Sequence, residues 1–233
     1  MKINLFERAI KRSLRRLGLT VVKEDIFHSI ASPGPLDVLV RLNIECNSVL
    51  HIGGHFAEEA ETYRKAGVRK AVFVEGDPQI YTLMQKILQN YPDFSGICAL
   101  LSNKKESVKF NIASNSGSSS SILFPERHLI NEPNITFEKS VILETSTLDS
   151  LGLGAFDLVV LDVQGAELLV IEGGMHTINQ AQALWIEVNA GSMYKGDASS
   201  AQIVTALADS FVPVFMSMNA NLWGDALFIR KPA

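Results

Sequence analysis

The fold is decided by residues 49–77, which read VLHIGGHFAEEAETYRKAGVRKAVFVEGD. A short apolar run stops at Gly53 and Gly54, apolar residues then recur at helical spacing, and a second apolar run ends in Glu75. We expect strands at 48–52 and 70–74 and a helix at 56–66. In such a strand-helix-strand unit the two strands are parallel, so the glycine turn and Glu75 lie at the same carboxyl edge of a sheet.

This edge of the expected sheet suits a ligand that contains a nucleoside. Glycines in the turn let the backbone come close to the ligand, and the start of the following helix offers free N–H groups. A carboxylate at the end of the second strand accepts hydrogen bonds from both hydroxyls of a ribose. We therefore expect Gly53 and Gly54 beside the ligand and Glu75 at its ribose.

The composition indicates one α/β domain with an N-terminal extension. The chain has 233 residues, of which 47% are hydrophobic and 20% are charged, which is enough to bury one substantial core. We expect a helical extension at 1–47 and the domain at 48–233. A net charge of -4 argues against nucleic acid as a partner.

Cysteine use and hydropathy predict a cytoplasmic protein. Cys46 and Cys98 are too few for a disulfide framework, and neither has the spacing of a metal ligand. No apolar run reaches the roughly 18 residues that a membrane span needs, and no apolar segment typical of a signal peptide follows the basic N-terminus.

The extension contains a basic amphipathic segment at 3–17. Its apolar residues form one stripe, Phe6, Ile10, Leu14 and Leu17, and its arginines and lysines face away from that stripe. Two interpretations fit this pattern. Either the basic face is simply solvated while the helix packs on the domain, or it makes peripheral contact with a membrane surface or an acidic partner.

Strands and helices alternate through the rest of the chain. Asp77 and Pro78 are typical of a helix start, as are Ser199 and Gln202 in a capping box. The expected helices lie at 36–42, 78–88, 166–171 and 199–208. The helix after Pro78 is expected to bury Ile80, Leu83, Met84, Ile87 and Leu88. The expected strands lie at 94–101, 108–113, 137–143, 156–161, 183–189, 212–218 and 226–229.

This order of elements predicts an α/β fold with an open, mostly parallel seven-stranded sheet and helices on both faces. The last two strands, joined through a turn that contains Gly224, are expected to form a C-terminal antiparallel hairpin. A serine-rich segment, 115–121, interrupts the alternation. It is either a flexible surface loop or a lid that covers a polar acceptor.

A second informative stretch is 156–167, which reads FDLVVLDVQGAE. Its apolar run is typical of a central parallel strand buried on both faces, and it brings Asp162 to the carboxyl edge near the Gly53 turn. The strand at 183–189 brings Glu187 to the same edge. An unpaired buried carboxylate is costly, so Glu187 is a candidate for a functional role. Glu167 is expected to stabilise the first turn of its helix.

Together these motifs resemble the FkbM family of S-adenosylmethionine-dependent methyltransferases. The resemblance covers about residues 48–190 and is most specific in the Asp-Val-Gln-Gly-Ala-Glu block. Its other parts are the His-Ile-Gly-Gly-His turn, Val-Glu-Gly-Asp-Pro after the second strand, the serine run and Thr-Leu-Asp-Ser-Leu at 147–151. It implies a Rossmann-like methyltransferase fold, S-adenosylmethionine as cofactor, and O-methylation of a hydroxyl on a sugar or natural-product-type acceptor.

The resemblance also implies which residues hold the cofactor. The glycines and histidines of the turn lie by its methionine part, Glu75 holds the ribose hydroxyls, Ser102 lies by the adenine, and Asp162 faces the methionine end and the acceptor. The implied set is His51, Gly53, Gly54, His55, Glu75, Ser102 and Asp162.

Methyl transfer to a hydroxyl also needs a base as the oxygen attacks. The candidates are Asp162, His55 and Glu187. Histidine has the most suitable ordinary pKa, whereas the pKa of a carboxylate would have to be raised by burial or by neighbours. We hypothesise that Asp162 orients the acceptor or the cofactor and that His55 assists proton removal.

The histidines also have plainer interpretations. His51 could simply end a strand and hydrogen-bond a loop carbonyl. His51 and His55 share the spacing of a zinc pair, but they straddle a glycine turn and not a helix face, so we expect no metal.

Two other functions remain open. A nicotinamide-dependent oxidoreductase is one, although the turn lacks the third glycine of G-x-G-x-x-G. The other is a catalytically inactive, methyltransferase-like binding module. Its main argument is that the turn departs from the family's common Asp-x-Gly-Ala-Asn-x-Gly. Cofactor binding separates all three.

Overall fold

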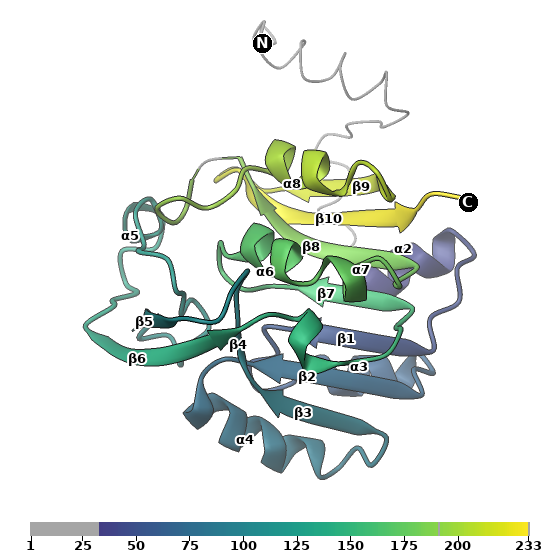
Figure 1. Cartoon of the computed structure of the whole chain (residues 1–233), viewed down its shortest axis with the longest axis horizontal. Coiled ribbons are helices and arrows are strands. Elements are labelled where there is room, and N and C mark those ends of the chain that lie inside the picture. Colours follow the sequence, from purple (N-terminus) through teal and green to yellow (C-terminus); the bar gives the residue numbers. More distant parts are fainter. Residues whose placement is uncertain (1–32, 191, 233) are drawn as a thin grey trace, which may run out of the picture.

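The computed structural model describes residues 33–190 and 192–232 and contains one large sheet between two layers of helices (Figure 1). Its strands lie in the order β3-β2-β1-β7-β8-β10-β9, and β10 runs antiparallel to both neighbours. The strands are β1 Ser48–Ile52, β2 Lys70–Glu75, β3 Phe94–Cys98, β7 Leu158–Leu161, β8 Ala183–Asn189, β9 Phe211–Met218 and β10 Trp223–Arg230. The predicted mostly parallel seven-stranded sheet with a C-terminal antiparallel hairpin is confirmed.

Helices cover both faces because alternate residues of each buried strand point to opposite sides. In β2, Val72 and Val74 belong to one apolar core, and Ala71 and Phe73 belong to the other. The first core is closed by α6 (Glu167–Gly173), α7 (Met175–Ile178) and α8 (Ser200–Leu207). The second is closed by α2 (Pro35–Arg41), α3 (Ala60–Lys65) and α4 (Pro78–Leu88).

An insertion between β3 and β7 forms a smaller sheet at the carboxyl ends of the parallel strands (Figure 1). Its strands are β4 (Leu100–Leu101), β6 (Lys139–Ser146) and β5 (Ser107–Ile112), in that spatial order. The insertion also contains α5 (His128–Asn131), and the 3-10 helix η2 (Asp149–Leu151) follows β6. Asn111 and Ser121 exchange backbone hydrogen bonds of 2.9 and 3.1 Å, which fixes the end of the serine segment, 115–121, to β5.

Strand boundaries differ from the predicted ones where the pairing partner changes. The strand expected at 94–101 is divided, because β3 pairs with β2 as far as Cys98 whereas Leu100 pairs with Thr145 of β6. Hydropathy carries no information on this change of partner. The observed β6 is shifted toward the C-terminus relative to the expected 137–143, and β10 extends at both ends beyond the expected 226–229.

Two helix predictions need correction. The helix expected from Phe56 begins only at Ala60, because φ is positive at His55 (41°) and Ala57 (59°), which keeps this part of the chain in a turn.

The expected buried face of α4 is correct for Met84 and Leu88 and wrong for two other positions. These are Leu83 and Ile87, which are each 43% exposed, because α4 lies at the sheet edge, where β2 and β3 cover only one side of the helix.

Both predicted helix starts are confirmed. Asp77 accepts hydrogen bonds from the N–H groups of Gln79 and Ile80, and Ser199 forms a capping box with Gln202. The helix expected at 36–42 is α2. The amphipathic segment 3–17, and with it both interpretations of its basic face, lies outside the described residues. No helix in the described part of the chain is long and apolar enough to cross a membrane.

Gly53 is expected to be essential for the approach of β1 to β7. An alanine Cβ at this position would lie 1.7 Å from the Asp162 carbonyl oxygen, and φ is +86°. We expect Gly53→Ala to lower the free energy of unfolding by about 3 kcal/mol or more. Gly67→Ala is a matched control, because φ is +88° there but the Cβ has open space, so the expected loss is about 1 kcal/mol. Equal losses in denaturant unfolding would contradict the close contact.

Candidate functional site

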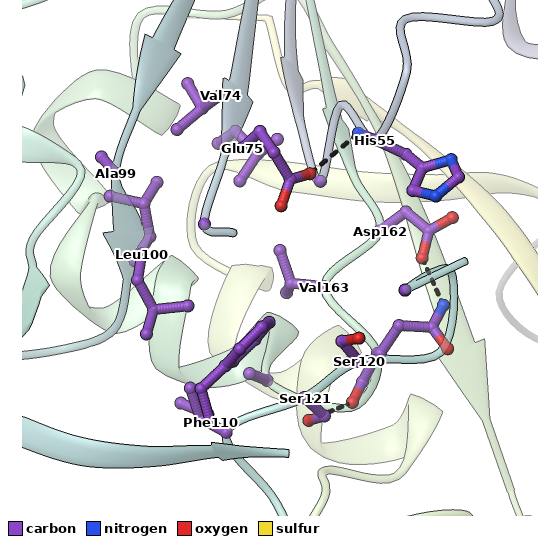
Figure 2. Close-up of a pocket in the computed structure, with 18 of the residues that line it drawn as sticks. His55, Val74, Glu75, Ala99, Leu100, Phe110, Ser120, Ser121, Asp162 and Val163 are labelled. Carbon is purple, nitrogen blue, oxygen red and sulfur yellow. Dashed lines mark hydrogen bonds between the residues drawn. The ribbon is translucent and has the colours of Figure 1, made fainter. Parts of the chain in front are cut away.

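A pocket lies at the carboxyl ends of β1, β2 and β7, where the serine segment covers it (Figure 2). The glycine turn forms its floor. Gly53 and Gly54 both donate backbone hydrogen bonds to the Val74 carbonyl, at 2.9 and 3.0 Å, which holds the turn against the end of β2. Gly53 lines the pocket, whereas a Cβ on Gly54 would meet the Phe73 side chain at 3.0 Å. The two predicted glycines therefore have different roles, one facing the pocket and one packing inward.

Glu75 presents a fixed carboxylate to this pocket. Its Oε2 accepts the His55 backbone N–H at 2.9 Å, and its Oε1 accepts the Asp77 backbone N–H at 2.7 Å. Burial raises the pKa of Glu75, and these two donors and the nearby His55 limit the rise. Each oxygen keeps acceptor capacity for a further partner. Glu75 therefore lies where the sequence predicted a partner for ribose hydroxyls.

The wall opposite the turn is apolar. Val74, Ala99, Leu100 and Phe110 contribute it (Figure 2), and together they suit the faces of a flat base. Ser102, which was expected by the adenine, lies outside this wall. Its side chain is buried and its backbone N–H bonds to the Ser146 carbonyl. The division of the expected strand at 94–101 is the reason, since it turns the chain away from the pocket before Ser102.

The block from Asp162 to Glu167 forms a tight turn between β7 and α6. Gln164 has φ +55° and Gly165 has φ +96°. The Glu167 carboxylate accepts the backbone N–H groups of Val163 and Gly165, both at 3.1 Å. Burial, and then the charge of Asp162, raises the pKa of Glu167 to about 7. Glu167 was expected to stabilise the first turn of its helix, and in the structure its carboxylate holds the turn that precedes this helix.

Asp162 and Glu187 lie on either side of the Gln164 amide. Gln164 Nε2 is 2.7 Å from Asp162 Oδ1 and 3.2 Å from Glu187 Oε2. Burial raises the pKa of both carboxyls, and the charge of Asp162 raises that of Glu187 further. On β10, Asp225 lies opposite Glu187 in the register, and burial raises its pKa to about 6. Asp162 lines the pocket and Glu187 lies behind it. Two of the side chains that the sequence analysis named as candidate bases therefore lie close together.

His51 faces away from the pocket. Its side chain is buried against α3, where Nδ1 is 2.9 Å from the Tyr63 hydroxyl and the ring stacks on Phe73. The structure thus brings His51 to the opposite side of the turn from His55. Among the described residues, no group of three His, Cys, Asp or Glu side chains is arranged to hold a metal ion.

His55 joins the glycine turn to the serine segment. Its Nδ1 is 2.7 Å from Glu58 Oε1, and its Nε2 is 3.0 Å from the Ser116 carbonyl oxygen. Both partners are acceptors, so both ring nitrogens act as donors, as in the imidazolium form. To act as a base, His55 would first have to lose the proton on one of these nitrogens, and with it one of the two hydrogen bonds. Burial lowers the pKa of His55, but the bonds to Ser116 and Glu58 and the charges of Glu58 and Glu75 outweigh it and raise the pKa.

The serine segment is packed over the pocket and is not a free surface loop. Ser119 and Ser121 are buried, and the Ser121 hydroxyl donates to the Gln164 carbonyl at 2.8 Å. The Tyr194 hydroxyl donates to the Ser119 carbonyl at 3.0 Å. The sequence analysis missed Gln164 and Tyr194. The first stands inside the most specific motif and could have been found there, whereas no local pattern marks Tyr194.

The Methyltransferase FkbM domain matches this chain over residues 51–212. The chain belongs to the FkbM methyltransferase family. This membership implies S-adenosylmethionine as the cofactor. Membership of this family removes the nicotinamide-dependent oxidoreductase from the alternatives.

Individual known proteins resemble this chain to different extents. The curated 2-O-methyltransferase NoeI of Sinorhizobium fredii is 35% identical over 82 residues, which span 34% of each chain. A crystal structure of methyltransferase FkbM from Methylobacillus flagellatus has a TM-score of 0.56 at 13% identity, covering 96% of this chain and 59% of that one, which shows the shared fold. Magnesium protoporphyrin IX methyltransferase from Synechocystis has a TM-score of 0.49 at 12% identity, covering 99% and 86%.

We expect the contact between His55 and the serine segment to weaken as pH rises. The folded-state pKa of His55 is raised, so the bond it makes as imidazolium is present at low pH and is lost as pH rises through that pKa. An NMR titration of the His55 ring should give a pKa above about 6.5, the ordinary value, and amide hydrogen exchange in 115–121 should increase over the same pH range. Glu58→Gln should lower this pKa. A pKa at or below the ordinary value would contradict the geometry.

Proposed function

We propose that this chain transfers the methyl group of S-adenosylmethionine to a hydroxyl oxygen on a sugar or natural-product-type acceptor. The observation that supports the proposal is that the Asp162 carboxyl lines the pocket with the Glu187 carboxyl behind it, both bonded to the Gln164 amide. A carboxylate placed in this way is suited to take the proton that a hydroxyl loses. The relative NoeI, a 2-O-methyltransferase by name, supports oxygen as the acceptor atom.

The residues present fit the cofactor. Gly53 lines the pocket with backbone alone, and the apolar wall with Leu100 and Phe110 suits an adenine. Glu75 has both carboxylate oxygens fixed by backbone donors and still able to accept ribose hydroxyls. S-adenosylmethionine supplies an electrophilic methyl group on a positively charged sulfur. Everything else in the reaction depends on how this chain positions the acceptor and removes its proton.

The Asp162 and Glu187 carboxyls are suited to that proton removal. Both carboxyls bond to the Gln164 amide, and burial raises the pKa of each above its ordinary value, which makes a carboxylate a stronger base. A carboxylate of this pair would take the hydroxyl proton as the acceptor oxygen receives the methyl group, and the neutral thioether would leave as the product.

His55 fits a supporting role better than that of the base. Its ring bonds to Glu58 and to the Ser116 carbonyl occupy both nitrogens, so His55 holds the serine segment over the pocket. Its contribution then lies in closing the site against water and keeping the acceptor in place.

We expect Glu75→Gln to weaken cofactor binding about tenfold or more. The amide replaces a charged acceptor by a neutral one and leaves one acceptor atom where there were two. Titration calorimetry with S-adenosylhomocysteine measures the effect, and Glu106→Gln, at a partly exposed residue in an ion pair with Lys104, is the control. Unchanged affinity in Glu75→Gln would contradict the ribose assignment. Failure of the unmodified protein to bind would favour the inactive binding module.

We expect Asp162→Asn and Glu187→Gln each to lower turnover by about 100-fold or more, because each removes part of the base. His55→Ala should cost less than about tenfold and should act mainly on KM, since it loosens the serine segment. A panel of mono- and oligosaccharides with labelled methyl donor provides the assay, and NMR of the product locates the methyl group. Normal turnover in both carboxyl variants would contradict the proposal. An equal loss in His55→Ala would return the role of base to His55.

A further inference from the structure

The side chain and the backbone of Gln164 connect several parts of the site through hydrogen bonds. Its amide nitrogen donates to Asp162 Oδ1 at 2.7 Å and to Glu187 Oε2 at 3.2 Å, and its Oε1 is 3.1 Å from the Tyr194 hydroxyl. Its backbone carbonyl accepts the Ser121 hydroxyl (Figure 2). One residue thus connects the ends of β7 and β8, and its backbone connects both to the serine segment.

The turn that contains Gln164 fixes the direction of its side-chain amide. A φ of +55° is uncommon for a glutamine. The Glu167 carboxylate holds the turn on both sides by accepting the N–H groups of Val163 and Gly165. The side chain therefore has a defined direction, and that direction leads between two carboxyl groups.

The surroundings of Asp162 oppose its ionisation. Like charges and burial both favour the protonated form of a carboxyl. The hydrogen bond from Gln164 favours the ionised form most, followed by the nearby His51 and a hydrogen bond with Glu187. The titratable groups around the Asp162 and Glu187 pair are His51 on β1, Glu59 before α3, Glu167 on α6, Tyr194 after β8 and Asp225 on β10.

We propose that Gln164 is a positioning residue that keeps the Asp162 carboxylate ionised and directed into the cofactor pocket, so that this pocket prefers the cationic methyl donor to its product. S-adenosylmethionine carries one positive charge on sulfur, and that charge is absent from S-adenosylhomocysteine. A buried ionised carboxylate discriminates between the two by Coulomb attraction. The proposal rests on the proposed function. It adds that the product binds more weakly than the methyl donor, because methyl transfer removes the positive charge on sulfur.

Removing the Gln164 amide should change this preference in a pH-dependent way. Without the donor the pKa of Asp162 rises further, so at pH values below the raised pKa the carboxyl is protonated and the cationic ligand loses its partner. As pH rises through that value, ionisation returns and the preference recovers. A purely structural defect in the turn would weaken both ligands at every pH.

The experiment is calorimetric titration of the full chain with S-adenosylmethionine and, separately, S-adenosylhomocysteine between about pH 5.5 and pH 9. Gln164→Met removes the amide while keeping the length of the side chain. Gln164→Leu, a second variant, removes the donor with an uncharged side chain. Ser121→Ala is the matched control, because it removes the hydroxyl bond to the Gln164 backbone and leaves the amide in place.

Both Gln164 variants should bind S-adenosylmethionine about tenfold more weakly at the lower pH values, with recovery at high pH and less than a threefold change for S-adenosylhomocysteine. Ser121→Ala should leave the ratio of the two affinities unchanged. Equal weakening of both ligands at all pH values, or no change for either, would overturn the role of Gln164. If the unmodified protein bound neither ligand, the proposed function itself would fail.

Discussion

The site depends on the close approach of two backbones, those of Gly53 after β1 and Asp162 after β7. Asp162 donates its N–H to the Ile52 carbonyl at 3.0 Å, and the space where Gly53 would carry a Cβ is filled by the Asp162 carbonyl. Because nothing separates the two strand ends, the glycine turn and the acidic block share one pocket with Glu75. Buried parallel strands supply this arrangement, since their carboxyl ends meet at one edge.

Two polar links then close the pocket from opposite sides of the serine segment. His55 holds its beginning through the Ser116 carbonyl, and Gln164 holds its end through the Ser121 hydroxyl. The first link involves a charged ring and the second a neutral hydroxyl and carbonyl. The cover of the pocket is therefore fixed by one contact that responds to pH and one that does not. In the Asp162 and Glu187 pair, burial is the main cause that raises the pKa of each carboxyl.

Sequence reasoning located the parts of the site that follow from strand ends. Gly53, Glu75 and Asp162 line the pocket because each directly follows or ends an apolar run, and position along a parallel strand decides location at the sheet edge. It could not show on which face of β1 the His51 side chain lies. Both faces of this strand are apolar, so the alternation of side chains does not indicate which of them points toward the pocket. Ser102 and Tyr194 depend on long-range pairing, β4 with β6 and the Tyr194 hydroxyl with Ser119, for which no local pattern exists.

The most direct measurement is a crystal structure of the chain bound to S-adenosylhomocysteine. We expect the ribose hydroxyls within hydrogen-bond distance of the Glu75 carboxylate, the adenine against Leu100 and Phe110, and the sulfur on the side of Asp162. The serine segment should remain over the ligand. A ligand bound in the reverse direction, with its ribose away from Glu75, or bound outside this pocket would contradict the assignment of the site.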